Sequence, residues 1–176
     1  DASGRNAEGG DDDEVVLDLR GDRVAVESWI VRPLVKASRL SRDDENQGLG
    51  IIFPYELTSG SAKLVSPEAL ESRAPKAFAY LSSHREELEG RGHDTREFYA
   101  YGSTQGLTTS FGTKILVPPM SAQGAMYLWH DEVSTFYSGY CIKFQGDLAA
   151  LRARLSQPDF VEYVRAVGRE YRGGYF

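Results

Sequence analysis

Residues 14–27 read EVVLDLRGDRVAVE, and this stretch carries the clearest structural signal in the chain. Val15, Leu17 and Leu19 occupy every second position, and the alternation resumes after Arg20-Gly21-Asp22. Strands with one buried face alternate in this way, and a glycine-containing turn between two such strands is typical of a β-hairpin. We therefore expect the folded part of the chain to begin with an antiparallel hairpin.

The residues that precede the hairpin have a different composition. Residues 1–13 are rich in Gly, Asp, Asn and Ala and have no apolar periodicity, so we expect a disordered acidic leader or linker. Residues 1–14 carry six acids and one base, which leaves a net charge of −1 for the rest of a chain whose total is −6. The expected organisation is this leader followed by one domain at 14–176.

Helices and strands in the rest of the chain occur in blocks, without the regular alternation of a doubly wound sheet. This order predicts an α+β fold with a mixed, mainly antiparallel sheet and packed helices. Further strands are expected at 50–55, 113–117, 125–129 and 139–144, with a polar turn region between the last two. Helices are expected after Ser66, Pro75, Asp147 and Pro158, the last with Phe160, Val161, Val164 and Val167 on its buried face.

The sequence lacks the motifs that usually mark cofactor binding, metal binding and catalysis. The sequence contains no phosphate-binding P-loop, no dinucleotide glycine motif, no HExxH and no CxxC, so no cofactor, metal site or catalytic residue is predicted. No apolar run reaches the length of a membrane span. The single cysteine, Cys141, favours a cytoplasmic setting. A hydrolase built on His130 and Asp131 stays open only as a third alternative.

From about Glu27 onward, a set of short motifs follows a fixed order. They are VRPLVK (31–36), IIFPY (51–55), PKAFAYL (75–81), REEL (85–88), FYAYGSTQ (98–105), KILVP (114–118) and YRGGYF (171–176). In these motifs the chain resembles the target-recognition region that follows the catalytic domain in γ-class, N6-adenine-specific DNA methyltransferases of restriction-modification and phage-defence systems. Where this family often carries Arg, the present chain has Ser103.

The resemblance implies a module that recognises double-stranded DNA in the major groove and gives sequence specificity to a covalently linked adenine methyltransferase. The Asn/Asp-Pro-Pro-Tyr/Phe motif and the S-adenosylmethionine-binding glycine motif of such enzymes are absent from this sequence. The chain alone is therefore not expected to be an enzyme. S-adenosylmethionine would bind the catalytic domain of the parent protein, and no membrane partner is expected.

Candidate DNA-binding residues follow from this reading. Residues 20–42 carry six bases against two acids, and cations there would hold phosphates, whereas ordinary surface charge is the alternative interpretation. Residues 99–109 offer polar side chains among glycines that could read base edges, and a tight turn with packed tyrosines is the alternative. The candidates are Arg32, Lys36, Arg39, Arg42, Tyr99, Tyr101, Ser103, Thr104, Gln105, Lys114 and Arg172.

A second function class also fits the composition. The acidic leader and the nearly neutral remainder of the chain are compatible with a protein-interaction or scaffolding module that docks a partner subunit. A stoichiometric protein partner, rather than DNA, would then occupy the functional surface.

Overall fold

The computed structural model describes residues 3–9, 14–19, 21–40, 48–58, 61–91, 97–103, 106–120, 127–129 and 132–168. The chain divides into two compact units. The first unit comprises Asp1–Leu34 and Gly48–Thr109, and the second comprises Val35–Gln47 and Ser110–Phe176. A single domain at 14–176 was expected, but each unit has its own cluster of buried apolar residues.

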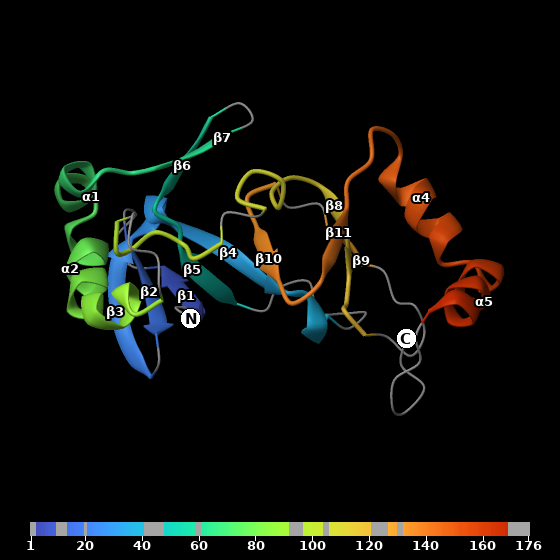
Figure 1. Ribbon diagram of the computed structural model, residues 1–176, viewed down its shortest axis with the longest axis horizontal. Helices are drawn as coiled ribbons and strands as arrows, with labels where there is room; N and C mark the ends of the chain where they lie inside the picture. The colour runs from blue at the N-terminus through green and yellow to red at the C-terminus, as the bar shows by residue number, and fades with distance from the viewer. Residues whose placement is uncertain are drawn as a thin grey trace. The chain divides into compact units, whose positions relative to one another are not determined.

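The first unit is built on an antiparallel sheet with the strand order β4-β5-β1-β2-β3 (Figure 1). Its strands are β1 (Ser3–Gly9), β2 (Glu14–Leu19), β3 (Asp22–Glu27), β4 (Val31–Lys36) and β5 (Leu49–Ile52). The 3₁₀ turn η1 (Ser28–Ile30) joins β3 to β4, and β6 (Tyr55–Thr58) and β7 (Ser61–Leu64) form a separate hairpin.

The hairpin expected at 14–27 is confirmed as β2 and β3. Leu17 pairs with Val24, and Val15 pairs with Val26, so the apolar side chains of both strands share one face of the sheet. Gly21 has a φ of +95°, a conformation that side chains other than glycine rarely adopt, and its N–H donates to Asp18 Oδ1 at 3.0 Å. The turn therefore sets the register that buries this face.

The expected disordered leader is wrong for Ser3–Gly9. These residues form β1, which lies between β5 and β2 and pairs with both, with Arg5 opposite Leu49 on one side and Asp18 on the other. Backbone N–H and C=O groups make these pairings whatever the side chains are. A segment without apolar periodicity can therefore become an inner strand when two neighbouring strands offer their edges.

Three helices follow the β6–β7 hairpin in the first unit: α1 (Pro67–Arg73), α2 (Pro75–Ser83) and α3 (Arg85–Glu89). The start expected after Ser66 is confirmed, because its hydroxyl accepts the N–H of Ala69 at 3.3 Å. Leu70 and Ala77 turn inward and are fully buried. They join a core whose other buried members are Leu17, Leu19, Val26, Ile30, Ile52, Val65, Ala74, Leu81, Phe98 and Tyr99.

The second unit contains the antiparallel sheet β11-β8-β9, made of β8 (Lys114–Val117), β9 (Tyr127–Trp129) and β11 (Tyr140–Ile142). A strand that was not expected, β10 (Thr135–Tyr137), occupies the region predicted as a polar turn. It is hydrogen-bonded to β4, whose last two residues belong to this unit. The 3₁₀ turn η2 (Ala37–Arg39) follows β4.

Two helices, α4 (Leu148–Leu155) and α5 (Pro158–Val167), complete the second unit (Figure 1). Asp147 caps α4 as expected, since its carboxylate accepts the N–H of Ala150 at 2.9 Å. The face expected for α5 is only partly covered: Phe160, Val161 and Val164 are its half-buried residues, none of its residues is fully buried, and Val167 is 64% exposed. Amphipathic spacing shows which side of a helix is apolar, but not that another element covers it.

These elements define an α+β fold in which every strand pairing with a resolved register is antiparallel. Among the helices of the described ranges, none has the length and apolar character needed to cross a bilayer.

Candidate nucleic-acid interface

The basic segment at residues 31–39 places its cations in three different environments. Arg32 is half-buried, and its Nη1 donates to the carbonyl oxygens of Trp29 at 2.9 Å and Val31 at 3.1 Å. Lys36 is also half-buried, with its Nζ 5.4 Å from the centroid of the Tyr137 ring. Arg39, at the end of η2, is exposed. Arg32 therefore braces the backbone of the first unit, whereas Lys36 and Arg39 belong to the second.

The two tyrosines expected to face DNA pack inside the first unit. Tyr99 is 3% exposed and its hydroxyl donates to the carbonyl of Val65 at 2.7 Å. The Tyr101 hydroxyl donates to the carbonyl of Ile52 at 2.6 Å, and its N–H donates to the Tyr55 hydroxyl. The alternative interpretation, packed tyrosines in a tight turn, describes what both side chains do.

Burial of Tyr99 and Tyr101 also raises the pKa of their hydroxyl groups. Burial, with the nearby carboxylates of Glu97 and Glu68 as smaller causes, raises the pKa of Tyr99 to about 12. Burial raises the pKa of Tyr101 further, with Tyr55 as the lesser cause. Both phenols therefore stay protonated donors at neutral pH.

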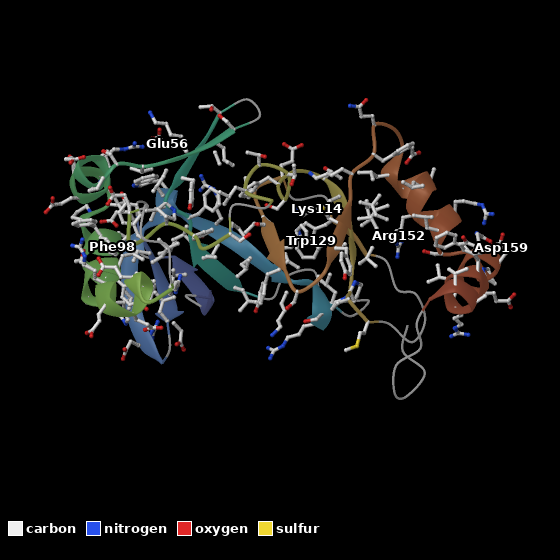
Figure 2. All side chains as sticks on the ribbon, in the orientation of Figure 1. Glu56, Phe98, Lys114, Trp129, Arg152 and Asp159 are labelled. Atoms are coloured by element: carbon white, nitrogen blue, oxygen red, sulfur yellow. The ribbon has the colours of Figure 1, made fainter. Side chains whose placement is uncertain are left out.

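Lys114 is not a surface cation, as a phosphate contact would require. It is completely buried, and its Nζ donates to the carbonyl oxygens of Ser134 at 2.8 Å and Gly112 at 3.1 Å. In the register of the sheet it lies directly opposite Trp129, and Figure 2 shows the two side by side. Lys114 was a candidate phosphate contact, but the carbonyls of the nearby Gly112 and of the distant Ser134 hold its ammonium inside the unit.

Of the five remaining candidate DNA-binding residues, one is exposed and four lie outside the described residues. Ser103 is exposed, just before the end of a described range. Arg42, Thr104, Gln105 and Arg172 lie outside the described residues. Among the predicted cations within the described ranges, Lys36 and Arg39 are the two whose charge is reachable on the second unit.

Charge is divided unequally between the two units. The first unit has ten Lys or Arg against seventeen Asp or Glu, a net of −7, and the second has ten against nine, a net of +1. In the first unit three exposed cations are paired with its own carboxylates: Arg73 with Glu56, Lys76 with Glu14, and Arg85 with Glu89. An anionic polymer would therefore meet less repulsion at the second unit.

The second unit also carries exposed cations that the residue-level prediction did not single out. Lys143 follows β11 and its Nζ donates to the carbonyl of Phe111, while Arg152 lies on α4 and Arg165 on α5. Arg154 forms a two-point ion pair with Asp159 at 3.0 and 2.9 Å. The mild excess of bases after residue 143 was the only sequence signal for this set.

No group of three or more His, Cys, Asp or Glu side chains that could hold a metal occurs within the described ranges. Comparison with known proteins adds no assignment, because no protein-family model matches the sequence and no curated protein matches it.

Proposed function

We propose that this chain is a recognition module for double-stranded DNA, and that its second unit faces the DNA. The observation that carries the proposal is the division of charge, net −7 in the first unit and +1 in the second. Lys36 and Arg39 supply cations on a single short segment of the second unit. Cations of this kind hold phosphates and position a protein on the duplex.

The sequence resemblance extends the proposal to a biological role. As in target-recognition regions of adenine-specific methyltransferases, the module would confer sequence specificity on a covalently linked catalytic domain that binds S-adenosylmethionine. Methylation of adenine N6 requires the base to leave the duplex, so a separate module that grips the flanking DNA is useful. Restriction-modification or phage defence would place such a protein in the cytoplasm.

Duplex binding can be measured by fluorescence anisotropy with a labelled DNA at low salt. Each phosphate contact contributes about 0.9 to the slope of log affinity against log salt concentration, so Lys36→Ala with Arg39→Ala should flatten the slope by about 1.8. The matched control is Arg91→Ala, an exposed arginine two residues after α3 in the acidic unit, which should bind as the wild type does. Salt-independent affinity, or equal losses in both variants, would contradict the proposal.

Sequence specificity needs a separate readout. Selection of bound duplexes from a randomised library should enrich a short motif if the module reads base edges. If the bound duplexes share no motif, the module binds DNA without sequence specificity, and the proposed role in target recognition is contradicted.

Docking of a protein partner is the second candidate, and the charge of −7 on the first unit favours it. A pull-down that yields a stoichiometric protein partner, together with no DNA protection by the parent protein, would support this candidate over DNA recognition.

A further inference from the structure

The two residues that join β10 to β11, Ser138 and Gly139, pack directly against η2. A Cβ placed on Gly139 would lie 2.4 Å from Cβ of Ala37 and 2.8 Å from the carbonyl oxygen of Val117, so the backbone of Gly139 touches both residues. The strand β10 is itself hydrogen-bonded to β4, which leads into η2. The connection is therefore fixed beside the segment that carries Lys36.

The backbone of Ser138 has a conformation that favours glycine. Its φ is +55°, and among the described residues it is the only one other than glycine with a positive φ. Ser138 is exposed, and no other group in the described part of the chain hydrogen-bonds to its hydroxyl. Strained residues of this kind concentrate at ligand-binding sites. A glycine would form the connection at lower cost, so the hydroxyl contributes nothing to the fold that explains its presence.

A cation is held beside this serine. The Lys36 Nζ lies 5.4 Å from the centroid of the Tyr137 ring, and Tyr137 directly precedes Ser138. Both side chains are half-buried. An ammonium attracted to the face of a ring has less freedom to lose when it binds an anion. Lys36 therefore presents a positioned charge next to an exposed hydroxyl.

The segments that meet at Gly139 bring no negative charge of their own. Each contacting residue lies in a stretch without Asp or Glu, namely residues 28–42, 98–130 and 133–146. The first of these stretches also carries Arg39, which is exposed at the end of η2. An anion that approaches this place meets the cations of these segments without repulsion from carboxylates on the same segments.

We propose that Ser138 and Lys36 together bind one phosphate of the DNA backbone. The Ser138 hydroxyl donates a hydrogen bond to a phosphate oxygen, and the Lys36 ammonium balances the phosphate charge. This inference rests on the proposed function and deepens it, because it adds a neutral contact that fixes the position of the duplex. Contacts of this kind orient a protein on DNA without reading its sequence.

The test measures the anisotropy of labelled duplexes of several sequences with the whole chain. Ser138→Gly should weaken binding to all of them about five-fold and leave the salt slope unchanged, because a hydroxyl carries no charge. Lys36→Met should flatten the slope by about 0.9. If both groups hold the same phosphate, the double variant loses less affinity than the product of the two single losses.

Thermal unfolding separates a binding role from a structural one. Ser138→Gly should unfold at the wild-type temperature or higher, because glycine adopts a positive φ without strain. A lower unfolding temperature together with weaker binding would show that the serine serves the fold, and would overturn the inference. The matched control is Ser156→Gly, an exposed serine between α4 and α5 of the same unit, which should bind DNA as the wild type does.

The remaining outcomes distinguish this inference from the proposed function. If Ser138→Gly binds as the wild type does while Lys36→Met flattens the salt slope, the inference fails and the proposed function stands. A loss confined to some duplex sequences would overturn the inference in favour of a base contact. If no duplex binds, both fail, and stabilisation of the wild type but not of Ser138→Gly by inorganic phosphate would then assign the site to a free phosphate.

Discussion

The carboxylate of Glu27, the last residue of β3, accepts the backbone N–H of Lys76 at 2.9 Å, in the first turn of α2. Its second oxygen accepts the N–H of Ala77 at 3.1 Å. The N-cap residue of α2 is Ala74, which has no side-chain acceptor for these groups. A strand residue 49 positions earlier in the chain therefore performs the capping that the helix lacks locally.

Replacement of Glu27 by Ala should lower the free energy of unfolding by about 1 kcal/mol, the usual effect of losing a helix cap. Glu27→Gln should lose less, because one acceptor oxygen remains. Urea unfolding followed by circular dichroism measures both. The control is Glu71→Ala on the exposed side of α1, and an equal loss there would show that the effect is general removal of negative charge rather than loss of the cap.

Burial of Lys114 makes the second unit sensitive to that position. Lys114→Met keeps the length of the side chain but leaves the carbonyl oxygens of Ser134 and Gly112 without this donor. Unsatisfied buried groups are costly, so the free energy of unfolding should fall by about 2 kcal/mol. Thermal unfolding measures the loss, with Lys63→Met on the exposed side of β7 as the matched control. Equal stability of the two variants would contradict an anchoring role.

Stability should decline in alkaline solution because of the buried phenols. Tyr99 has a pKa near 12 in the folded chain and an ordinary value near 10 when unfolded, so the unfolded chain releases its proton first. The stabilisation is fully present below pH 10 and is lost as the pH rises from 10 toward 12, at about 1.4 kcal/mol per pH unit. The raised pKa of Tyr101 acts in the same direction.

The measurement compares the free energy of unfolding at pH 9 and pH 11. Tyr99→Phe should reduce the difference by about 1.4 kcal/mol, since the variant has no phenol to ionise there. Tyr163→Phe on the exposed side of α5 is the matched control and should leave the difference unchanged. A Tyr99→Phe protein with the full alkaline loss would exclude Tyr99 as its cause.

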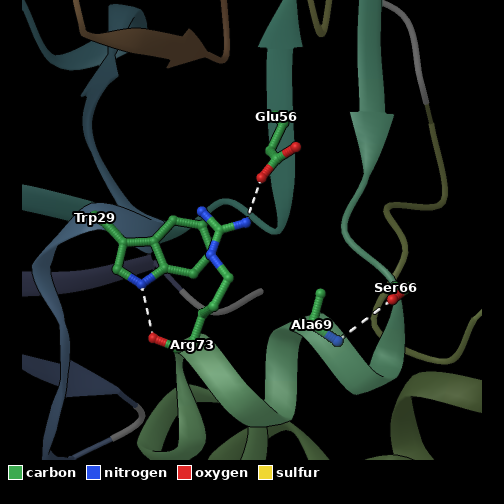
Figure 3. Close-up of polar contacts among 5 residues, drawn as sticks. All are labelled: Trp29, Glu56, Ser66, Ala69 and Arg73. Atoms are coloured by element: carbon green, nitrogen blue, oxygen red, sulfur yellow. Dashed lines mark hydrogen bonds and ion pairs between the residues drawn. The ribbon is translucent and has the colours of Figure 1, made fainter.

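Arg73 ties the end of α1 to two other elements of the first unit. Its guanidinium carbon lies 4.5 Å from the centroid of the Trp29 ring, and it forms an ion pair with Glu56, while its carbonyl accepts the Trp29 Nε1–H at 3.0 Å (Figure 3). Stacking and ion pairing at a partly exposed site are each modest contributions.

Arg73→Ala should therefore lower the free energy of unfolding by about 1 kcal/mol and shift Trp29 fluorescence to longer wavelength as the ring gains water. Emission spectra are read in a Trp129→Phe background, so that Trp29 alone reports. Arg91→Ala, two residues after α3, serves as the control. An unchanged spectrum would show that the guanidinium does not cover the ring in solution.

Local signals in the sequence predicted local structure well. The turn at Gly21, the cap at Ser66 and the cap at Asp147 were all expected from neighbouring residues and are all observed. Each depends on groups within three positions along the chain, so the sequence window contains all the atoms that matter. The α+β class followed from the order of these signals.

The candidate site was harder to predict because exposure depends on distant segments. Tyr99 and Lys114 have the residue types of a DNA contact, yet the carbonyls of Val65 and Ser134 enclose their polar atoms. Tyr140 was expected within a strand, and only the packing shows that its side chain is 66% exposed. Residue type predicts what a side chain can bind, whereas packing decides whether it is reachable.

By itself, the sequence determined the mixed fold class, the positions of the hairpin turn and the helix starts, and the asymmetric distribution of charge. Tertiary structure alone decided that Ser3–Gly9 becomes an inner strand, that two cores form instead of one, and that Glu27 caps a distant helix. The physical reason is the range of the interactions. Turns and most caps are completed within a few residues, but strand pairing, burial and long-range capping are completed only by groups that folding brings together.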